Sequence, residues 1–263
     1  MTNALQPDET RTFATDDGLR LTYDVWRPSG APVGVPVVLH HGFSASAHTN
    51  WVTTGIVPAL LSEGRTVVGL DARGHGRSDK PYDPALYGHN RMRADVSLLL
   101  DQLGHERVDL VGYSMGGFVA AITAAHPEPR LRSVIIGGIG GRATGSANIN
   151  REAIAAGLVA DESQLITDRT ARQFRQYAEM TGADRLALAA IMRSSFEPLT
   201  GLDRVSVPTL VLVGENDELA TSPELLADAI PGALLQLTPG THMSAIAEQQ
   251  YINAITAFLR SCD

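Results

Sequence analysis

A serine flanked by glycines is the strongest chemical signal in this sequence of 263 residues. In residues 108–117 an apolar run leads into Gly112-x-Ser114-x-Gly116 and then into small residues that begin a helical pattern. A serine on such a sharp strand-to-helix turn needs glycines on both sides, because neighbouring backbone must pass close to it. The turn presents the hydroxyl at a helix N-terminus, where backbone N–H groups favour developing negative charge. The pattern predicts that Ser114 is a nucleophile.

A serine nucleophile needs a base, and the base needs a carboxylate that orients it. Asp217 follows the apolar run 209–214, and His242 follows the last apolar run, 233–237. Open α/β sheets place their sites where the carboxyl ends of strands meet, so these turns are expected to lie beside Ser114. The order Ser114, Asp217, His242 is that of a Ser-Asp-His triad.

Short apolar runs alternate with longer helical patterns, which predicts a mostly parallel sheet with right-handed helical crossovers. Most of the expected strands are β-branched or Leu-rich and nearly continuous in hydrophobicity, as strands buried on both faces should be. They are residues 21–26, 35–40, 66–70, 108–113, 131–136, 209–214 and 233–237. Residues 12–15 and 21–26 are instead expected to form an antiparallel hairpin at one edge. Apolar residues recur on one helix face in residues 90–103 and near the end of the chain.

Residues 142 to about 200 interrupt this alternation. The stretch contains no convincing strand, is rich in Ala, Leu and Arg, and follows a glycine-rich run at 137–141. We expect a helical cap laid over the C-terminal edge of the sheet. Within it, the spacing of Arg169, Arg172 and Arg175 predicts a solvated helix face.

Composition excludes several classes of function. Lys and Arg number 21 against 29 Asp and Glu, a net charge of −8, and no basic block is present. This balance predicts no nucleic-acid partner and no binding to anionic lipid. A single cysteine, Cys262, predicts neither a disulfide nor a multi-cysteine metal site. The sequence has no apolar run long enough for a membrane span, and its first residues do not match a secretion signal, so a soluble cytoplasmic protein is expected.

Taken together, these motifs resemble those of the α/β-hydrolase superfamily. The resemblance includes His40-His41-Gly42-Phe43 after one expected strand and the segment 71–78, Asp-Ala-Arg-Gly-His-Gly-Arg-Ser, after the next. It implies an α/β fold with about eight strands, in which residues 1–141 and 201–263 form the core domain and residues 142–200 the cap.

The resemblance also implies a role for each site residue. Ser114 is then the nucleophile, His242 the general base and later acid, and Asp217, rather than the nearby Glu215, its orienter. The backbone N–H groups of Phe43 and Met115 would form the oxyanion hole, each typically worth about 3 kcal/mol of transition-state stabilisation.

A serine at this turn, rather than an aspartate, predicts acyl transfer without a cofactor. The first hypothesis is a carboxylic ester hydrolase that acts on a small or medium-sized ester through an acyl-enzyme. A lactonase, a cofactor-free perhydrolase and a carbon–carbon bond hydrolase use the same triad, although Gly42-Phe43-Ser44-Ala45-Ser46 departs from the loop of the last class. A slow-turnover small-molecule receptor of the same fold is the alternative from a different class.

The substrate pocket is expected between the sheet edge and the cap. Besides Phe43 and Met115, its candidate lining residues are Trp51, Tyr87, Met192, Phe196 and Met243. The remaining histidines are scattered and resemble no metal cluster, so no metal is predicted. For His40, His41 and His75, bonds to the backbone are favoured over proton transfer. No feature of the sequence distinguishes a monomer from a homodimer.

Overall fold

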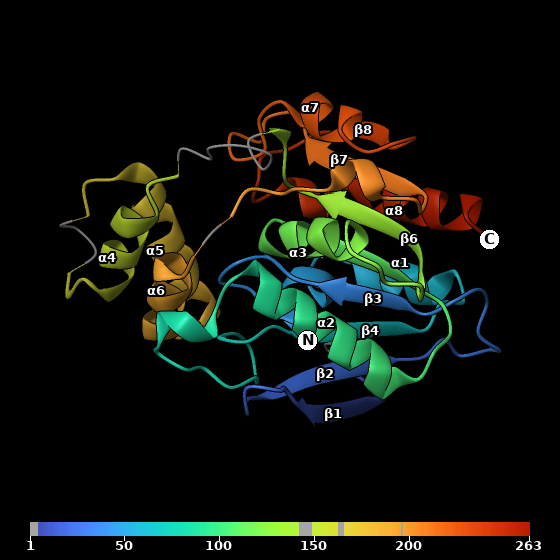
Figure 1. Cartoon of the computed structure of the whole chain (residues 1–263), viewed down its shortest axis with the longest axis horizontal. Coiled ribbons are helices and arrows are strands. Elements are labelled where there is room, and N and C mark those ends of the chain that lie inside the picture. Colours follow the sequence, from blue (N-terminus) through green and yellow to red (C-terminus); the bar gives the residue numbers. More distant parts are fainter. Residues whose placement is uncertain (1–4, 142–148, 163–165, 196) are drawn as a thin grey trace.

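A computed structural model describes residues 5–141, 149–162, 166–195 and 197–263. At its centre is an eight-stranded sheet with the order β1-β2-β4-β3-β5-β6-β7-β8 (Figure 1). β2 pairs antiparallel with β1 and with β4, and all other neighbours are parallel. The strands are β1 (Glu9–Ala14), β2 (Arg20–Trp26), β3 (Val37–His40), β4 (Val67–Asp71), β5 (Val108–Tyr113), β6 (Leu131–Gly137), β7 (Thr209–Gly214) and β8 (Leu234–Thr238). The predicted fold class and the hairpin at one edge are confirmed.

Strand bounds differ from the predicted ones mainly at the ends. β3 begins at Val37 rather than at Val35, because Pro36 has no N–H to donate to a neighbouring strand. β8 lies at the edge of the sheet, and Leu234, Leu235 and Leu237 are exposed. Its apolar residues therefore do not signal burial, unlike those of β5 and β7, which are buried throughout.

Helices cover both faces of the sheet. The side chains of the inner strands alternate between two hydrophobic clusters, so that Val38 belongs to one and Leu39 to the other. The first cluster packs under α2 (His89–Leu103), α3 (Met115–Ala124) and α7 (Pro223–Asp228). The second packs under α1 (Ile56–Ser62) and α8 (Gln249–Ser261). No helix within the described residues is long and apolar enough to cross a bilayer.

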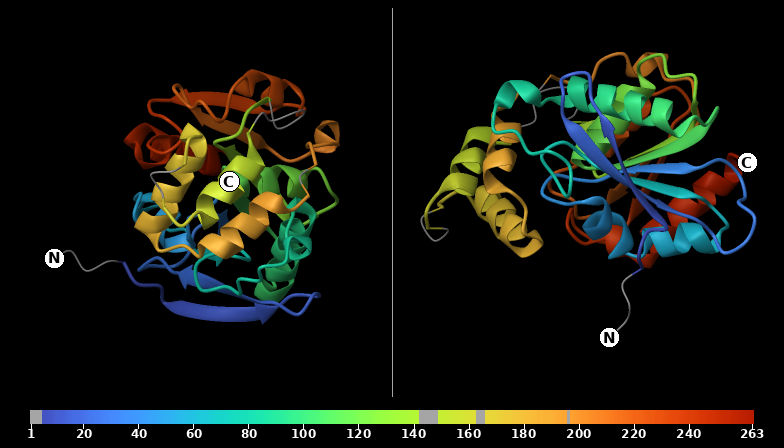
Figure 2. Two further views of the ribbon diagram at one scale, coloured as in Figure 1. Left: turned by 90° about the vertical axis from the view of Figure 1, so that its left-hand side faces the viewer. Right: turned by 90° about the horizontal axis from the view of Figure 1, so that it is seen from below.

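Three further helices lie together to one side of the sheet (Figures 1 and 2). They are α4 (Arg151–Val159), α5 (Arg169–Thr181) and α6 (Arg185–Arg193), and all of them fall within the stretch expected to form the cap. Residues 142–148, 163–165 and 196 of that stretch lie outside the described residues.

Hydrogen bonds from polar side chains stabilise the ends of these three helices. The side chains of Asn150, Asp168 and Asp184 accept hydrogen bonds at the N-termini of α4, α5 and α6. The predicted solvated arginine face is wrong for Arg175, whose side chain is buried. Its Nη1 donates to carbonyl oxygens at the end of α4, including that of Gly157 at 2.9 Å. A cation at this position satisfies carbonyl groups that the helix itself leaves unbonded.

Candidate active site

The turn between β5 and α3 holds Ser114 in a strained conformation. Its φ is +54° and its ψ is −113°, values that a non-glycine residue rarely adopts. A Cβ on Gly112 would lie 2.0 Å from the carbonyl oxygen of Gly116, and a Cβ on Gly116 would lie 1.9 Å from that of His40. Both glycines are therefore required by close backbone approach. The Ser114 N–H donates to the Gly137 carbonyl at 2.8 Å, which ties the turn to β6.

A continuous chain of hydrogen bonds joins Ser114, His242 and Asp217. His242 Nε2 lies 2.9 Å from Ser114 Oγ, and His242 Nδ1 lies 2.8 Å from Asp217 Oδ2 and 3.0 Å from Oδ1. The carboxylate can only accept at neutral pH, so it selects the tautomer with a proton on Nδ1 and leaves Nε2 to accept from the serine hydroxyl. Asp217 and His242 are both buried, whereas Ser114 is partly exposed.

The loops after β7 and β8 hold the last two groups in place. Asp217 Oδ1 also accepts from the backbone N–H groups of Leu219 (2.9 Å) and Ala220 (3.0 Å), which orient the carboxylate. The Tyr113 hydroxyl donates to the carbonyl oxygen of His242 from the end of β5. The pair is therefore positioned by backbone and strand ends rather than by mobile surface groups.

The loop after β3, residues 41–44, passes close to Ser114. It is called the oxyanion loop below, after the role that the resemblance implies for it. A Cβ on Gly42 would lie 3.4 Å from Ser114 Cβ. Asn50 Oδ1 accepts the Gly42 N–H at 2.8 Å and fixes the loop from the π-helical turn His48–Val52. Neither the Phe43 nor the Met115 backbone N–H donates to another described residue. Two donors beside the serine hydroxyl are thus available to an oxygen atom of a ligand.

Two buried histidines fasten the oxyanion loop to the loop after β4. His41 Nδ1 donates to the Gly42 carbonyl, and its Nε2 accepts the Ala72 N–H at 3.0 Å. His75 Nδ1 donates to the Arg73 carbonyl, and its Nε2 accepts the Ser44 N–H at 3.2 Å. Both rings are neutral in this arrangement, because each uses one nitrogen as a donor and the other as an acceptor.

Burial explains why these histidines stay neutral. It lowers the pKa of His41, and it lowers the pKa of His75 well below the usual value, with help from the neighbouring His41. His40, also fully buried and next to His41, has a pKa lowered to about 3. The backbone bonds of His41 and His75 agree with the expectation that they do not transfer protons.

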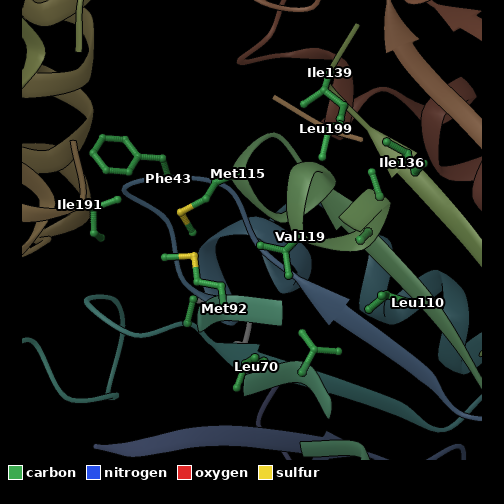
Figure 3. Packing of buried hydrophobic residues seen from close by; sticks show 14 of the residues in the cluster. Phe43, Leu70, Met92, Leu110, Met115, Val119, Ile136, Ile139, Ile191 and Leu199 are labelled. Atoms are coloured by element: carbon green, nitrogen blue, oxygen red, sulfur yellow. The ribbon is translucent and has the colours of Figure 1, made fainter. Parts of the chain in front are cut away.

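An apolar pocket opens beside Ser114, between the sheet and the helices α4–α6. Figure 3 shows Phe43, Met92, Met115 and Ile191 around the space between these two parts of the molecule. The same pocket includes Ser114 and His242, and its apolar lining includes Phe43, Met92, Met115, Phe118, Phe174, Ile191 and Met192. The Phe174 ring of α5 packs edge-on against the Phe43 ring, with 5.4 Å between the ring centroids. The helical layer therefore contacts the oxyanion loop directly.

The predicted pocket residues have different outcomes. Met192 lines the apolar pocket, and Met243 is exposed at the rim of an adjoining one. The prediction is wrong for Trp51, which is buried in the cluster under α1 and α8. It is also wrong for Tyr87, whose hydroxyl donates to the Pro81 carbonyl at 2.6 Å. Phe196 lies outside the described residues.

Several pocket residues could not be recognised from the sequence. Phe174 and Ile191 belong to helices whose apolar faces signal packing but not the partner of that packing. Met92 fits the regular apolar face of α2 and resembles an ordinary core residue. Asn50 has no local signal at all. Within the described residues, no group of three or more His, Cys, Asp or Glu side chains is arranged to hold a metal ion.

Comparison with known proteins agrees with the fold. Residues 35–161 match the family described as alpha/beta hydrolase fold. A solved hydrolase from Pseudomonas aeruginosa superposes with a TM-score of 0.77 at 28% identity, over 97% of this chain and 99% of that one. The chain belongs to the α/β-hydrolase superfamily.

Two of the sequence relatives are enzymes that are named for different activities. A bifunctional esterase/perhydrolase from Acinetobacter calcoaceticus is 28% identical over 281 residues, which cover 94% of this chain and 98% of that protein. A non-heme chloroperoxidase from Streptomyces lividans is 38% identical over 120 residues, 45% of this chain and only 40% of the relative. These relatives support a hydrolase activity for this chain.

Proposed function

We propose that this protein is a serine hydrolase that cleaves carboxylic esters of small or medium-sized acids through an acyl-enzyme intermediate. The observation that carries the proposal is the chain of hydrogen bonds from Ser114 Oγ through His242 to Asp217. A buried carboxylate, an imidazole of fixed tautomer and a hydroxyl in a strained turn are the parts that activate a serine for attack on a carbonyl.

In the first half of the reaction, Ser114 Oγ attacks the ester carbonyl while His242 Nε2 takes its proton. The carbonyl oxygen becomes negative and accepts hydrogen bonds from the Phe43 and Met115 N–H groups. The C–O bond of the ester then breaks, and His242 returns the proton to the leaving alcohol. The acyl group remains on Ser114.

Water completes the cycle by the same route. His242 removes a proton from water, which attacks the acyl-enzyme, and the second tetrahedral intermediate expels Ser114 Oγ as it regains the proton. Asp217 stays ionised throughout and stabilises the imidazolium that forms in each half. No group beyond these side chains and backbone donors is needed.

The helices α4–α6 act as a cap in this proposal, and the apolar pocket beneath them holds the acyl chain. Phe174 and Ile191 come from the cap, whereas Met92 and Met115 come from the sheet-based part. Burial of apolar surface is worth about 25 cal/mol per Å², so each methylene placed here favours binding. The pocket therefore supports preference for an ester whose acyl chain is longer than acetyl.

Steady-state kinetics with p-nitrophenyl esters of graded chain length test the proposal. Ser114→Ala should lower kcat by roughly four to six orders of magnitude on every ester that the wild type cleaves. Ser133→Ala is a matched control. It removes a buried hydroxyl that lies at the end of β6 away from Ser114 and donates to Asp109, and this variant should retain turnover. Equal turnover by Ser114→Ala and wild type would refute the proposal.

Perhydrolysis is a second candidate activity, favoured by the esterase/perhydrolase relative that matches most of the chain. Hydrogen peroxide would replace water in the second half, attack the acyl-enzyme and leave as a peracid, while Ser114 regains its proton. Peracid formation from hydrogen peroxide and a short ester should appear with the wild type and vanish in Ser114→Ala. Ester hydrolysis without peracid would restrict the function to the first candidate.

A further inference from the structure

The apolar pocket contains an arginine that ester cleavage does not use. Arg151, the first residue of α4, lies in the wall of the pocket that also includes Ser114 and His242. Its Nη2 donates to the carbonyl oxygens of Ile191 at 2.8 Å and Ser194 at 3.3 Å, where α6 ends. These bonds hold a half-buried guanidinium beside the side chains that line the acyl pocket.

The neighbouring charged residue points elsewhere. Glu152, next to Arg151 in α4, is exposed and pairs with Arg193 at 3.2 Å. This pair lies on the surface, whereas Arg151 faces the pocket. An arginine that served only the surface of α4 would have no reason to line a cavity that contains a candidate nucleophile.

The N-terminus of α2 also favours a negative ligand beside Arg151. Gly88 and His89, at the N-terminus of the 15-residue helix α2, line the same pocket. The first turn of α2 contains no acidic side chain, so the positive end of its dipole faces the pocket without a countercharge on that turn. His89 stacks on Phe118 at 5.0 Å, which holds the ring against the apolar wall.

Desolvation makes this cation receptive to an anion. Burial lowers the pKa of Arg151, which means that its charge loses hydration in the pocket. A carboxylate offers two oxygens in the plane that a guanidinium fork matches, and such charge-assisted bonds are about twice as strong as neutral ones.

We propose that the acyl part of the substrate ends in a carboxylate, which Arg151 binds inside the apolar pocket. The substrate class is then a monoester of a dicarboxylic acid, or a lactone that bears a carboxylate chain. The methylenes between the two ends contact Met92, Met115 and Ile191. This inference rests on the proposed function, because it assumes that the pocket holds the acyl group of an ester cleaved at Ser114.

The test compares two esters that differ only in the charge of the end group. Monoethyl succinate, glutarate and adipate are each paired with the ester in which a carboxamide replaces the free carboxylate. The wild type should prefer the carboxylate partner in kcat/KM for at least one chain length, and that length reports how far Arg151 lies from the reacting carbonyl. A preference for the carboxamide at all three lengths, or no preference, would overturn the proposal without any variant.

Variants of Arg151 then test whether this residue causes the preference for the carboxylate ester. Arg151→Gln should lower the carboxylate-to-carboxamide ratio by about 10- to 100-fold, the range expected for one charge-assisted hydrogen bond. Arg151→Lys, which keeps the charge but not the fork, should lower it less. Arg193→Gln is the matched control, because it removes an arginine from the same helical layer that pairs with Glu152 outside the pocket.

The possible outcomes separate the two proposals. A wild type that cleaves neither these esters nor the p-nitrophenyl esters, or an activity that survives Ser114→Ala, contradicts the esterase function. Cleavage of the p-nitrophenyl esters alone contradicts only the carboxylate site. Cleavage that depends on Ser114 but shows the same ratio in Arg151→Gln contradicts only the carboxylate site. In that case Arg151 serves solely to satisfy the end of α6, and the variant should lose thermal stability without a change in selectivity.

Discussion

The sheet-based part of the molecule and the helical layer α4–α6 hold their residues in different ways. Ser114, Asp217 and His242 sit in loops that directly follow strands, and backbone hydrogen bonds fix two of them further. Among the described residues, the helical layer reaches the site through side chains, such as Phe174 on Phe43 and Thr181 Oγ1 on the Ser44 carbonyl at 2.9 Å.

This difference assigns different tasks to the two parts. Groups that form bonds with the substrate need positions fixed to a few tenths of an ångström, which rigid strands provide. Walls that select a chain length need only shape and surface, which packed helices provide. Substitutions of Ser114, Asp217 or His242 should therefore lower turnover of all esters alike, whereas those of pocket-lining residues in the helical layer should change the order of preference among the esters.

Asp217→Asn gives the largest expected effect in the sheet-based part. The amide no longer stabilises the imidazolium and favours the wrong tautomer of His242, so kcat should fall by roughly 10⁴-fold on short and long esters alike. Asp228→Asn, at an exposed position in α7, is the matched control. Turnover within tenfold of the wild type would show that the Asp217–His242 bond has no catalytic role.

Met192→Trp tests the other part by filling the apolar pocket from α6. The larger ring should lower kcat/KM for a p-nitrophenyl octanoate by about 10- to 100-fold relative to the acetate, because the longer chain loses its space. Leu186→Trp, exposed on the same helix, should leave the ratio unchanged. Equal losses for both esters would contradict the division of tasks.

Thr181→Val removes a hydroxyl that lies 2.9 Å from the Ser44 carbonyl in the oxyanion loop and 2.9 Å from the Tyr177 carbonyl in its own helix, while it keeps the shape of the side chain. We expect kcat/KM to fall by about three- to tenfold, consistent with one neutral hydrogen bond of about 1 kcal/mol. Thr200→Val, at an exposed site, provides the control. An unchanged rate would mean that the loop is held by Asn50, His41 and His75 without help from the helical layer.

Acid should destabilise the sheet-based part because burial lowers the pKa of three of its histidines. His40, His41 and His75 stay neutral in the folded protein below their ordinary pKa of 6.5, whereas the unfolded chain binds protons there. The unfolded state thus gains protons as the pH falls, and the free energy of unfolding should drop by up to about 1.4 kcal/mol per pH unit for each histidine.

Urea unfolding between pH 7 and pH 5 measures this slope. The His75→Gln variant should show a slope smaller by about one proton, whatever its stability at pH 7. His105→Gln, at an exposed position, is the matched control. A stability that does not change over this range would mean that these rings are protonated in the folded state.

The same division explains what the sequence could predict. The run into Gly112-x-Ser114-x-Gly116 is a local pattern, and β5 and β7 have the predicted bounds because their burial shows in their residue types. The pocket depends on which helix face meets which loop, and that is set by packing between distant segments. Phe174 and Arg175 show this: both lie in one amphipathic helix, yet one reaches Phe43 and the other the end of α4.

Covalent labelling tests the central claim most directly, because it asks whether Ser114 is an activated nucleophile. The protein is treated with an alkyl fluorophosphonate, and the adduct is located by mass spectrometry of peptides. The account predicts one adduct per chain on Ser114, none in Ser114→Ala, and labelling slowed by several orders of magnitude in His242→Ala. An adduct on another residue at the same rate, or no adduct on the folded wild type, would contradict it.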